Sequence, residues 1–133
     1  MNIEYKNCKE ISQDDLKTLF QSVGWLSANY PERLVRAINQ SATVMTAWDA
    51  GRLVGLISAL DDGELTAYIH YLLVHPDYQR RGIGTELLNR IKKTYENFLY
   101  IIIIAENKSL VPIYKRAGFG AQEEAIKMAV ISK

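Results

Sequence analysis

Residues 74–84 read Val-His-Pro-Asp-Tyr-Gln-Arg-Arg-Gly-Ile-Gly and lie between a predicted hydrophobic strand, Tyr68 to Val74, and a predicted amphipathic helix. A helix that begins in this way presents unpaired backbone N–H groups and the positive end of its dipole. The glycines leave the backbone bare, so that an anion can come within hydrogen-bond distance of successive amides. The stretch therefore predicts a phosphate or pyrophosphate site at the start of the helix.

Two common nucleotide-binding motifs do not fit this stretch. A dinucleotide-binding motif would place a third glycine three residues after Gly84, where the chain has Leu87. A P-loop would continue as Gly-Lys-Ser/Thr, whereas Gly84 is followed by Thr85 and Glu86. The predicted phosphate ligand therefore belongs to another class.

The pattern that remains is Gln/Arg-x-x-Gly-x-Gly after a strand that ends in Val-x-Pro. It resembles the acetyl-CoA-binding motif of the GNAT superfamily of N-acetyltransferases. Downstream, Asn107 follows the apolar run from Tyr100 to Ala105, and Tyr114-Lys-Arg-Ala-Gly-Phe119 comes seven residues later. This second pattern is similar to the closing motif of the same family. The two motifs stand in the family's order and support the resemblance over roughly residues 40 to 120.

The resemblance implies an α/β (α+β) fold with one mixed, mostly antiparallel, twisted sheet of about six to seven strands and helices on both faces. It also implies parallel central strands that splay apart, with a bulge around Leu72 to Val74. The length of 133 residues predicts a single domain over residues 1–133.

Hydrophobic periodicity predicts the elements along the chain. Helices are expected from Ser12, as N-cap, to Gly24, from Pro31, over 82–95 and over 109–117, and strands over 3–6, 44–48, 53–60, 64–74, 98–105 and 126–130. A hairpin turn is expected at 49–52. Strand 98–105 reads as buried on both faces. Strand 64–74, helix 82–95 and strand 98–105 form a βαβ unit, whose strands should be parallel neighbours.

The resemblance also assigns residues to acetyl-CoA, the expected co-substrate. The backbone of Leu73 and Val74 would pair with the amides of the pantetheine arm. Asn107 and Tyr114 would contact the co-substrate. The backbone amides that would hold the pyrophosphate, with charge added by the two arginines, come from Gln79, Arg80, Arg81, Gly82, Ile83, Gly84 and Thr85.

Two side chains are candidates for proton transfer. Tyr114 would protonate the departing CoA thiolate, because a phenol with a pKa of about 10 is protonated at neutral pH. His70 is the candidate base, on a strand similar to that of arylalkylamine N-acetyltransferases, with Tyr68 in place of a second histidine. Alternation places residues 68, 70 and 72 on one face. Many small relatives carry an acidic residue where this chain has Tyr71, so the base could also be a carboxylate or a water chain.

The acceptor is expected to be a primary amine of a small molecule. Acidic residues of the 61–64 turn could bind its cationic form, and aromatic walls could bind an arylalkyl group or an ammonium. The aromatic candidates are Trp25, Tyr30, Trp48, Tyr68 and Tyr71. A CoA-binding sensor without turnover and a protein or peptide N-acetyltransferase remain as alternatives.

Composition limits the other partners. The net charge of +1 predicts no nucleic-acid or membrane binding. The N-terminus has no apolar segment typical of a signal peptide, and the single cysteine suits a reducing cytoplasm. No metal is expected, and a homodimer stays open.

Overall fold

The computed structural model describes residues 2–106 and 108–131. The chain divides into two compact units, Met1–Ile103 and Ile104–Lys133. The first unit contains β1 (Ile3–Asn7), α1 (Gln13–Ser22), η1 (Leu26–Asn29), α2 (Pro31–Gln40), β2 (Thr43–Asp49), β3 (Arg52–Asp61), β4 (Thr66–Val74), η2 (Pro76–Tyr78), α3 (Ile83–Thr94) and β5 (Tyr100–Ile103). The second contains η3 (Lys108–Leu110) and α4 (Val111–Arg116).

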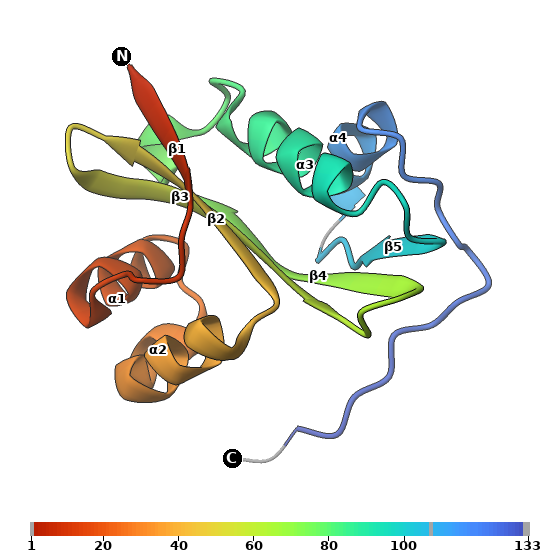
Figure 1. The fold of residues 1–133 in the computed structure, drawn as a ribbon, viewed down its shortest axis with the longest axis horizontal. Coiled ribbons are helices and arrows are strands. Elements are labelled where there is room, and N and C mark those ends of the chain that lie inside the picture. The colour runs from red at the N-terminus through yellow and green to blue at the C-terminus, as the bar shows by residue number, and fades with distance from the viewer. Residues whose placement is uncertain (1, 107, 132–133) are drawn as a thin grey trace. The chain divides into compact units, whose positions relative to one another are not determined.

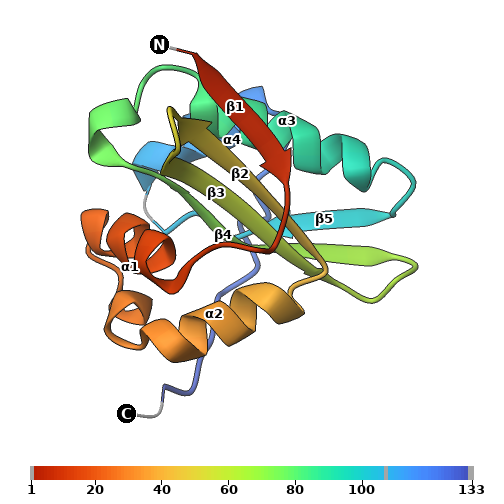
Figure 2. The ribbon, with the colours of Figure 1, turned by 60° about the vertical axis from the view of Figure 1, so that its left-hand side comes forward.

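The first unit is built on one five-stranded sheet with the order β1-β2-β3-β4-β5. The β4–β5 pair is parallel and the other three pairs are antiparallel. Helices α1 and α2 cover one face of this sheet and α3 covers the other (Figures 1 and 2). The mixed, mostly antiparallel α/β fold is confirmed, although the described residues form five strands rather than six to seven.

The predicted helices form because their apolar residues fall on one side. Ser12 accepts a hydrogen bond from the backbone N–H of Asp15 at 3.1 Å and caps α1 as predicted. Pro31 occupies the first turn of α2. One face of each helix packs against the sheet. The buried residues are Leu16, Leu19 and Phe20 of α1, Leu34 and Ile38 of α2, and Ile83, Leu87, Leu88 and Ile91 of α3.

The predicted hairpin turn joins β2 to β3. Asp49 pairs with Arg52, so the loop has two residues, Ala50 and Gly51, whose φ angles are 49° and 83°. Two positive φ angles are typical of the turn whose twist matches that of paired strands. The turn brings the Asp49 and Arg52 side chains to the same end of the sheet.

The strand β4 has a long ladder, interrupted by one bulge, on one side and a short ladder on the other. On the β3 side, Ser58 pairs with Tyr71 and Ala59 with Ile69, which leaves His70 as the extra residue of a β-bulge. On the β5 side, pairing runs only from Thr66 to Ile69. The bulge expected around Leu72 to Val74 therefore lies earlier, at His70.

The edge strand β5 differs from its prediction. Tyr100 and Ile102 are exposed by 59% and 46%, so β5 is not buried on both faces. It spans only Tyr100–Ile103, whereas the prediction was 98–105. A run of isoleucines predicts an apolar strand, but it does not show over how many residues a neighbouring strand pairs with it.

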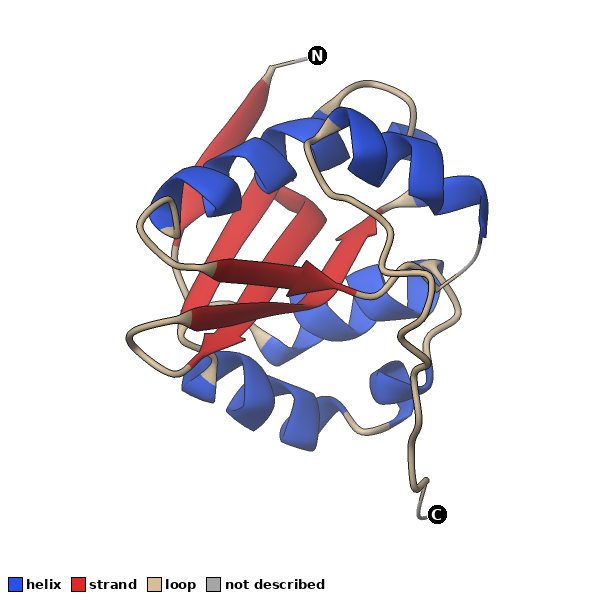
Figure 3. Ribbon diagram, turned by 90° about the vertical axis from the view of Figure 1, so that its right-hand side faces the viewer, coloured by secondary structure: helices blue, strands red, loops and turns tan. Residues whose placement is uncertain are grey.

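The second unit contains the predicted short helix but not the predicted last strand. Gly118, with a φ of 99°, ends α4, and the N–H of Phe119 bonds the carbonyl of Tyr114 at 2.9 Å. Residues 119–131 have no regular structure (Figure 3). Ile126, Met128 and Val130 alternate as in a strand but are exposed, and the described residues 104–131 include no strand for them to pair with.

No helix among residues 2–106 and 108–131 is long and apolar enough to cross a bilayer. Within the same residues, no group of three or more His, Cys, Asp or Glu side chains could hold a metal ion.

The tyrosine at the end of α3 generates a stability prediction. The Tyr95 hydroxyl donates to Asp61 at 2.7 Å and lies 2.7 Å from Thr43 Oγ1, and burial raises its pKa to about 12. Because the folded pKa exceeds 10, its stabilisation is complete below pH 10 and is lost as pH rises toward 12. We expect Tyr95→Phe to lower the free energy of unfolding by about 1–2 kcal/mol at pH 7, with a smaller difference from the wild type above pH 10.

The measurement is urea unfolding of both proteins from pH 7 to pH 11. Tyr100→Phe is the matched control, because it removes the hydroxyl of a tyrosine that is 59% exposed. A difference between Tyr95→Phe and wild type that stays constant with pH would contradict the prediction.

Candidate functional site

The predicted phosphate-binding stretch forms a compact turn between β4 and α3. The backbone folds into η2, where the N–H of Tyr78 bonds the carbonyl of His75 at 2.8 Å. Arg80 and Gly82 follow with positive φ angles of 64° and 85°. Only glycine adopts such an angle without strain, so Gly82 fits the sharp entry into the helix, while Arg80 is held in an uncommon conformation.

The first turn of α3 offers backbone donors. The first bond of the helix ladder runs from the N–H of Glu86 to the carbonyl of Gly82 at 3.0 Å, so the N–H groups of Ile83, Gly84 and Thr85 precede it. Gly82, the N-cap, contributes no side chain to satisfy them. A Cβ on Gly84 would meet only Val74 Cγ2, at 3.8 Å, so packing does not require this glycine. The arrangement fits an anion at the helix start.

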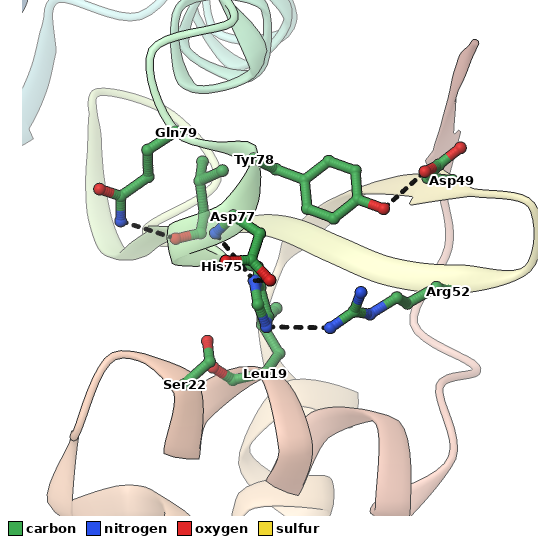
Figure 4. Close-up of polar contacts among 9 residues, drawn as sticks. Leu19, Ser22, Asp49, Arg52, His75, Asp77, Tyr78 and Gln79 are labelled. Atoms are coloured by element: carbon green, nitrogen blue, oxygen red, sulfur yellow. Dashed lines mark hydrogen bonds and ion pairs between the residues drawn. The ribbon is translucent and has the colours of Figure 1, made fainter. Parts of the chain in front are cut away.

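A network of side chains fastens the turn to the β2–β3 hairpin (Figure 4). The Tyr78 hydroxyl donates to Asp49 Oδ2 at 2.5 Å, and Arg52 Nη2 lies 3.0 Å from His75 Nε2. His75 Nδ1 also accepts from the N–H of Asp77 at 3.1 Å. A neutral imidazole accepts at only one ring nitrogen, so His75 can complete one of its two contacts at a time.

The far half of β4 has one edge outside the parallel ladder. The N–H of His75 bonds the carbonyl of Val54 at 2.8 Å, which marks a hydrogen-bonded pair with β3. Bonded and non-bonded pairs alternate, so Leu73 also turns its N–H and C=O toward β3, whereas Leu72 and Val74 turn theirs away. The carbonyl of Val74 accepts from Gln79 Nε2 at 2.9 Å on that side.

His70 lies within a continuous series of rings, which we call the aromatic row: Trp25, Tyr71, His70 and Tyr68. Successive ring centres are 5.9, 4.1 and 5.9 Å apart, and His70 stacks on Tyr71 at an interplanar angle of 22°. Strict alternation would place residues 70 and 71 on opposite faces; the bulge brings their rings together. Phe20 of the core holds Tyr71 in an edge contact at 5.0 Å.

His70 is an exposed residue, but its neighbours shield part of its imidazole ring from water. This partial desolvation lowers the pKa of His70 below its ordinary value of 6.5. The neutral ring, which can accept a proton, is therefore the prevailing form at neutral pH.

Other residues of the expected acceptor site make contacts of their own. Trp48 bonds Thr46 and contacts Lys6, while Tyr30 is 48% exposed beside Arg33. Two carboxylates of the 61–64 turn, those of Asp61 and Asp62, already have partners. Asp62 Oδ1 accepts backbone N–H bonds from Glu64, Leu65 and Thr66, and Asp61 accepts from Gly63 and Tyr95. They stabilise the turn.

Tyr114 belongs to α4 in the second unit and is buried. Burial, with a smaller effect of the Glu106 carboxylate, raises the pKa of Tyr114, so its hydroxyl stays protonated at neutral pH. Asn107 lies outside the described residues.

Sequence reasoning did not find the Asp49–Tyr78 and Arg52–His75 contacts. Both join the hairpin turn to the phosphate-binding stretch across more than 20 positions of chain, and nothing in local spacing signals such pairs. The presence of polar and aromatic side chains inside the motif could have indicated such contacts. A loop that bound phosphate through its backbone alone would not need these side chains.

The comparison with known proteins agrees with this architecture. The family model of the acetyltransferase (GNAT) domain matches residues 9–132. The chain therefore belongs to the GNAT acetyltransferase family.

Its relatives include an uncharacterized N-acetyltransferase, ycf52, of Gracilaria tenuistipitata var. liui. It is 28% identical over 122 residues, which are 88% of this chain and 66% of that protein. The chain thus spans about two thirds of that relative's length. A GNAT family acetyltransferase from Streptococcus pneumoniae TIGR4 superposes with a TM-score of 0.86 at 27% identity, over 99% of both chains.

A third protein shares the fold alone. AAC(6′)-Iy, solved in complex with the bisubstrate analog CoA-S-monomethyl-acetylneamine, superposes with a TM-score of 0.77 at 14% identity, over 99% of this chain and all of that chain.

The helix start generates a binding prediction. Gly84→Asp places a carboxylate beside the positive end of α3, which should leave stability unchanged or slightly increased. The same charge should repel a bound pyrophosphate and raise the Kd of acetyl-CoA at least about tenfold, or about 1.4 kcal/mol. Calorimetric titration measures the Kd and thermal unfolding the stability.

The matched control is Asn89→Asp, an equal change of charge at an exposed position farther along α3. It should leave the Kd within about twofold, because an exposed charge is screened over this distance. Equal Kd values for Gly84→Asp and wild type would show that the pyrophosphate does not bind at the start of α3.

Proposed function

We propose that this protein transfers the acetyl group of acetyl-CoA directly to a primary amine of a small-molecule acceptor. The observation that carries the proposal is the combination of donors at the start of α3 with the outward-facing backbone of Leu72 and Val74 on the adjacent strand. Membership of the GNAT family and a fold neighbour bound to a CoA analog support the same co-substrate.

The proposed co-substrate site has two parts. The N–H groups of Ile83, Gly84 and Thr85 hold the pyrophosphate, with charge from Arg80 and Arg81. The amides of the pantetheine arm pair with β4 as an added strand. Because Leu73 turns its polar groups toward β3, we assign this pairing to Leu72 and Val74 rather than to Leu73 and Val74.

Acetyl transfer requires a neutral amine and a protonated leaving thiolate. His70 accepts the proton of the amine, directly or through a water, since its lowered pKa keeps the ring neutral. Tyr114 donates to the thiolate, since its raised pKa keeps the hydroxyl protonated. Asn107 is proposed as a further contact of acetyl-CoA. Binding both substrates together supplies part of the rate by removing the entropy of encounter.

The aromatic row is the proposed wall of the acceptor site. Its faces suit an apolar or aromatic amine, and they can hold an ammonium by cation–π contact before the proton leaves. Tyr71 is fixed there by the contact of its hydroxyl with Ser27 at 3.1 Å and by its packing against Phe20. Where many small relatives have an acidic residue, this chain therefore presents the aromatic ring of Tyr71.

The test is acetyl-CoA-dependent release of free thiol across a panel of arylalkylamines, polyamines, aminoglycosides, amino acids and a lysine peptide. We expect release with a small amine and none without one. Release with the lysine peptide alone would favour the protein acceptor, and binding of acetyl-CoA without release from any amine would favour the sensor.

The assigned proton transfers predict a bell-shaped dependence of kcat on pH. The base acts when neutral, so activity should fall as pH decreases through the pKa of His70, below 6.5. His70→Ala should reduce kcat roughly 100-fold and remove this acidic limb. Tyr68→Phe is the control in the aromatic row and should retain the limb.

The acid acts when protonated, so activity should fall as pH rises through the pKa of Tyr114, above 10. Tyr114→Phe should lower kcat and remove the alkaline limb while the Kd of acetyl-CoA changes little. An unaltered profile in either variant would exclude that residue from proton transfer.

A further inference from the structure

The Tyr78 side chain lies at the centre of a charged cluster beside the proposed pyrophosphate site. Its hydroxyl donates to the Asp49 carboxylate, and two guanidinium groups approach its ring. Arg52 lies 5.7 Å and Arg81 lies 5.5 Å from the ring centre.

The ring contact restricts the orientation of the Arg81 guanidinium. Arg81 directly precedes Gly82, so its side chain leaves the backbone next to the amides at the start of α3. An arginine side chain loses considerable rotamer entropy when it binds an anion. A ring that already holds the guanidinium removes part of this cost before binding.

The hydrogen bond to Asp49 fixes the ring in turn. It raises the pKa of the Tyr78 hydroxyl, so the phenol stays neutral and leaves no negative charge that would pair with the arginines. Asp49 is itself held at the β2–β3 turn by its pairing with Arg52. The orientation of the ring therefore comes from the sheet and not from the turn alone.

We propose that Tyr78 is a positioning residue that holds the Arg81 guanidinium ready to pair with a phosphate group of acetyl-CoA. The inference rests on the proposed use of acetyl-CoA and adds a determinant of its affinity. Arg81, in this assignment, contacts the ligand, and Tyr78 acts through Arg81.

The first measurement compares two substitutions of the tyrosine. Tyr78→Leu removes the ring and should raise the Kd of acetyl-CoA about fivefold, with kcat at saturating acetyl-CoA within about twofold of wild type. Tyr78→Phe keeps the ring but lacks its hydrogen bond to Asp49, so it should restore only part of the lost affinity. Equal losses in both variants would overturn the proposal, because the ring contact would then be irrelevant.

A double-mutant cycle separates positioning from a general effect on folding. In an Arg81→Met background, Tyr78→Leu should change the Kd less than about twofold, since no guanidinium remains to be held. In the matched Arg80→Met background, the full loss of about fivefold should persist. A loss of the same size in all three backgrounds would overturn the proposal and leave Tyr78 as a support of the turn.

The outcomes also distinguish this inference from the proposed function. If the wild-type protein does not bind acetyl-CoA by calorimetry, both fail. If it binds and the cycle is additive, the proposed function stands and the role of Tyr78 fails. Thermal unfolding of each variant confirms that the Kd values refer to folded protein.

Discussion

The site depends on a strand that is held from one side. The strand β4 leaves its parallel partner at Ile69 but continues to Val74 on the ladder with β3. An unpaired buried backbone group costs about 1–3 kcal/mol, so such an edge survives only where water or a ligand can satisfy it. The burial of Ile69 and Leu73 holds the strand in place, while Leu72 and Val74 turn their polar groups away from β3, on the side where Gln79 already bonds the Val74 carbonyl.

The helix α3 makes the neighbouring anion site equally rigid. Leu87, Leu88 and Ile91 are fully buried, and Tyr95 ties the end of the helix to Asp61 and Thr43. The amides at the other end therefore point in a direction set by the core. A binding group that is fixed before the ligand arrives loses less entropy on binding, which is why packing far from the ligand affects affinity.

Much of this architecture could be predicted from the sequence, because it follows from local rules. For example, Gly82 at the start of the helix and Gly51 in the hairpin turn both have the positive φ angles that favour glycine. Helix faces followed from spacing. The rules failed where a partner decides the outcome: Ile126 and Val130 alternate as a strand does, yet alternation does not supply a neighbour to pair with.

The other misplaced feature is the bulge, which the family resemblance implied around Leu72 to Val74 and which lies at His70. It bears most on the chemistry. Alternation would have turned Tyr71 away from His70, whereas the extra residue stacks the two rings at 4.1 Å. Tyr71 in turn packs on Phe20, which is fully buried in α1. The orientation of the candidate base is thus set by the core through two successive ring contacts. A substitution at Phe20 that kept the fold would be expected to disturb proton transfer before it disturbed acetyl-CoA binding, because the pyrophosphate site is anchored separately through α3.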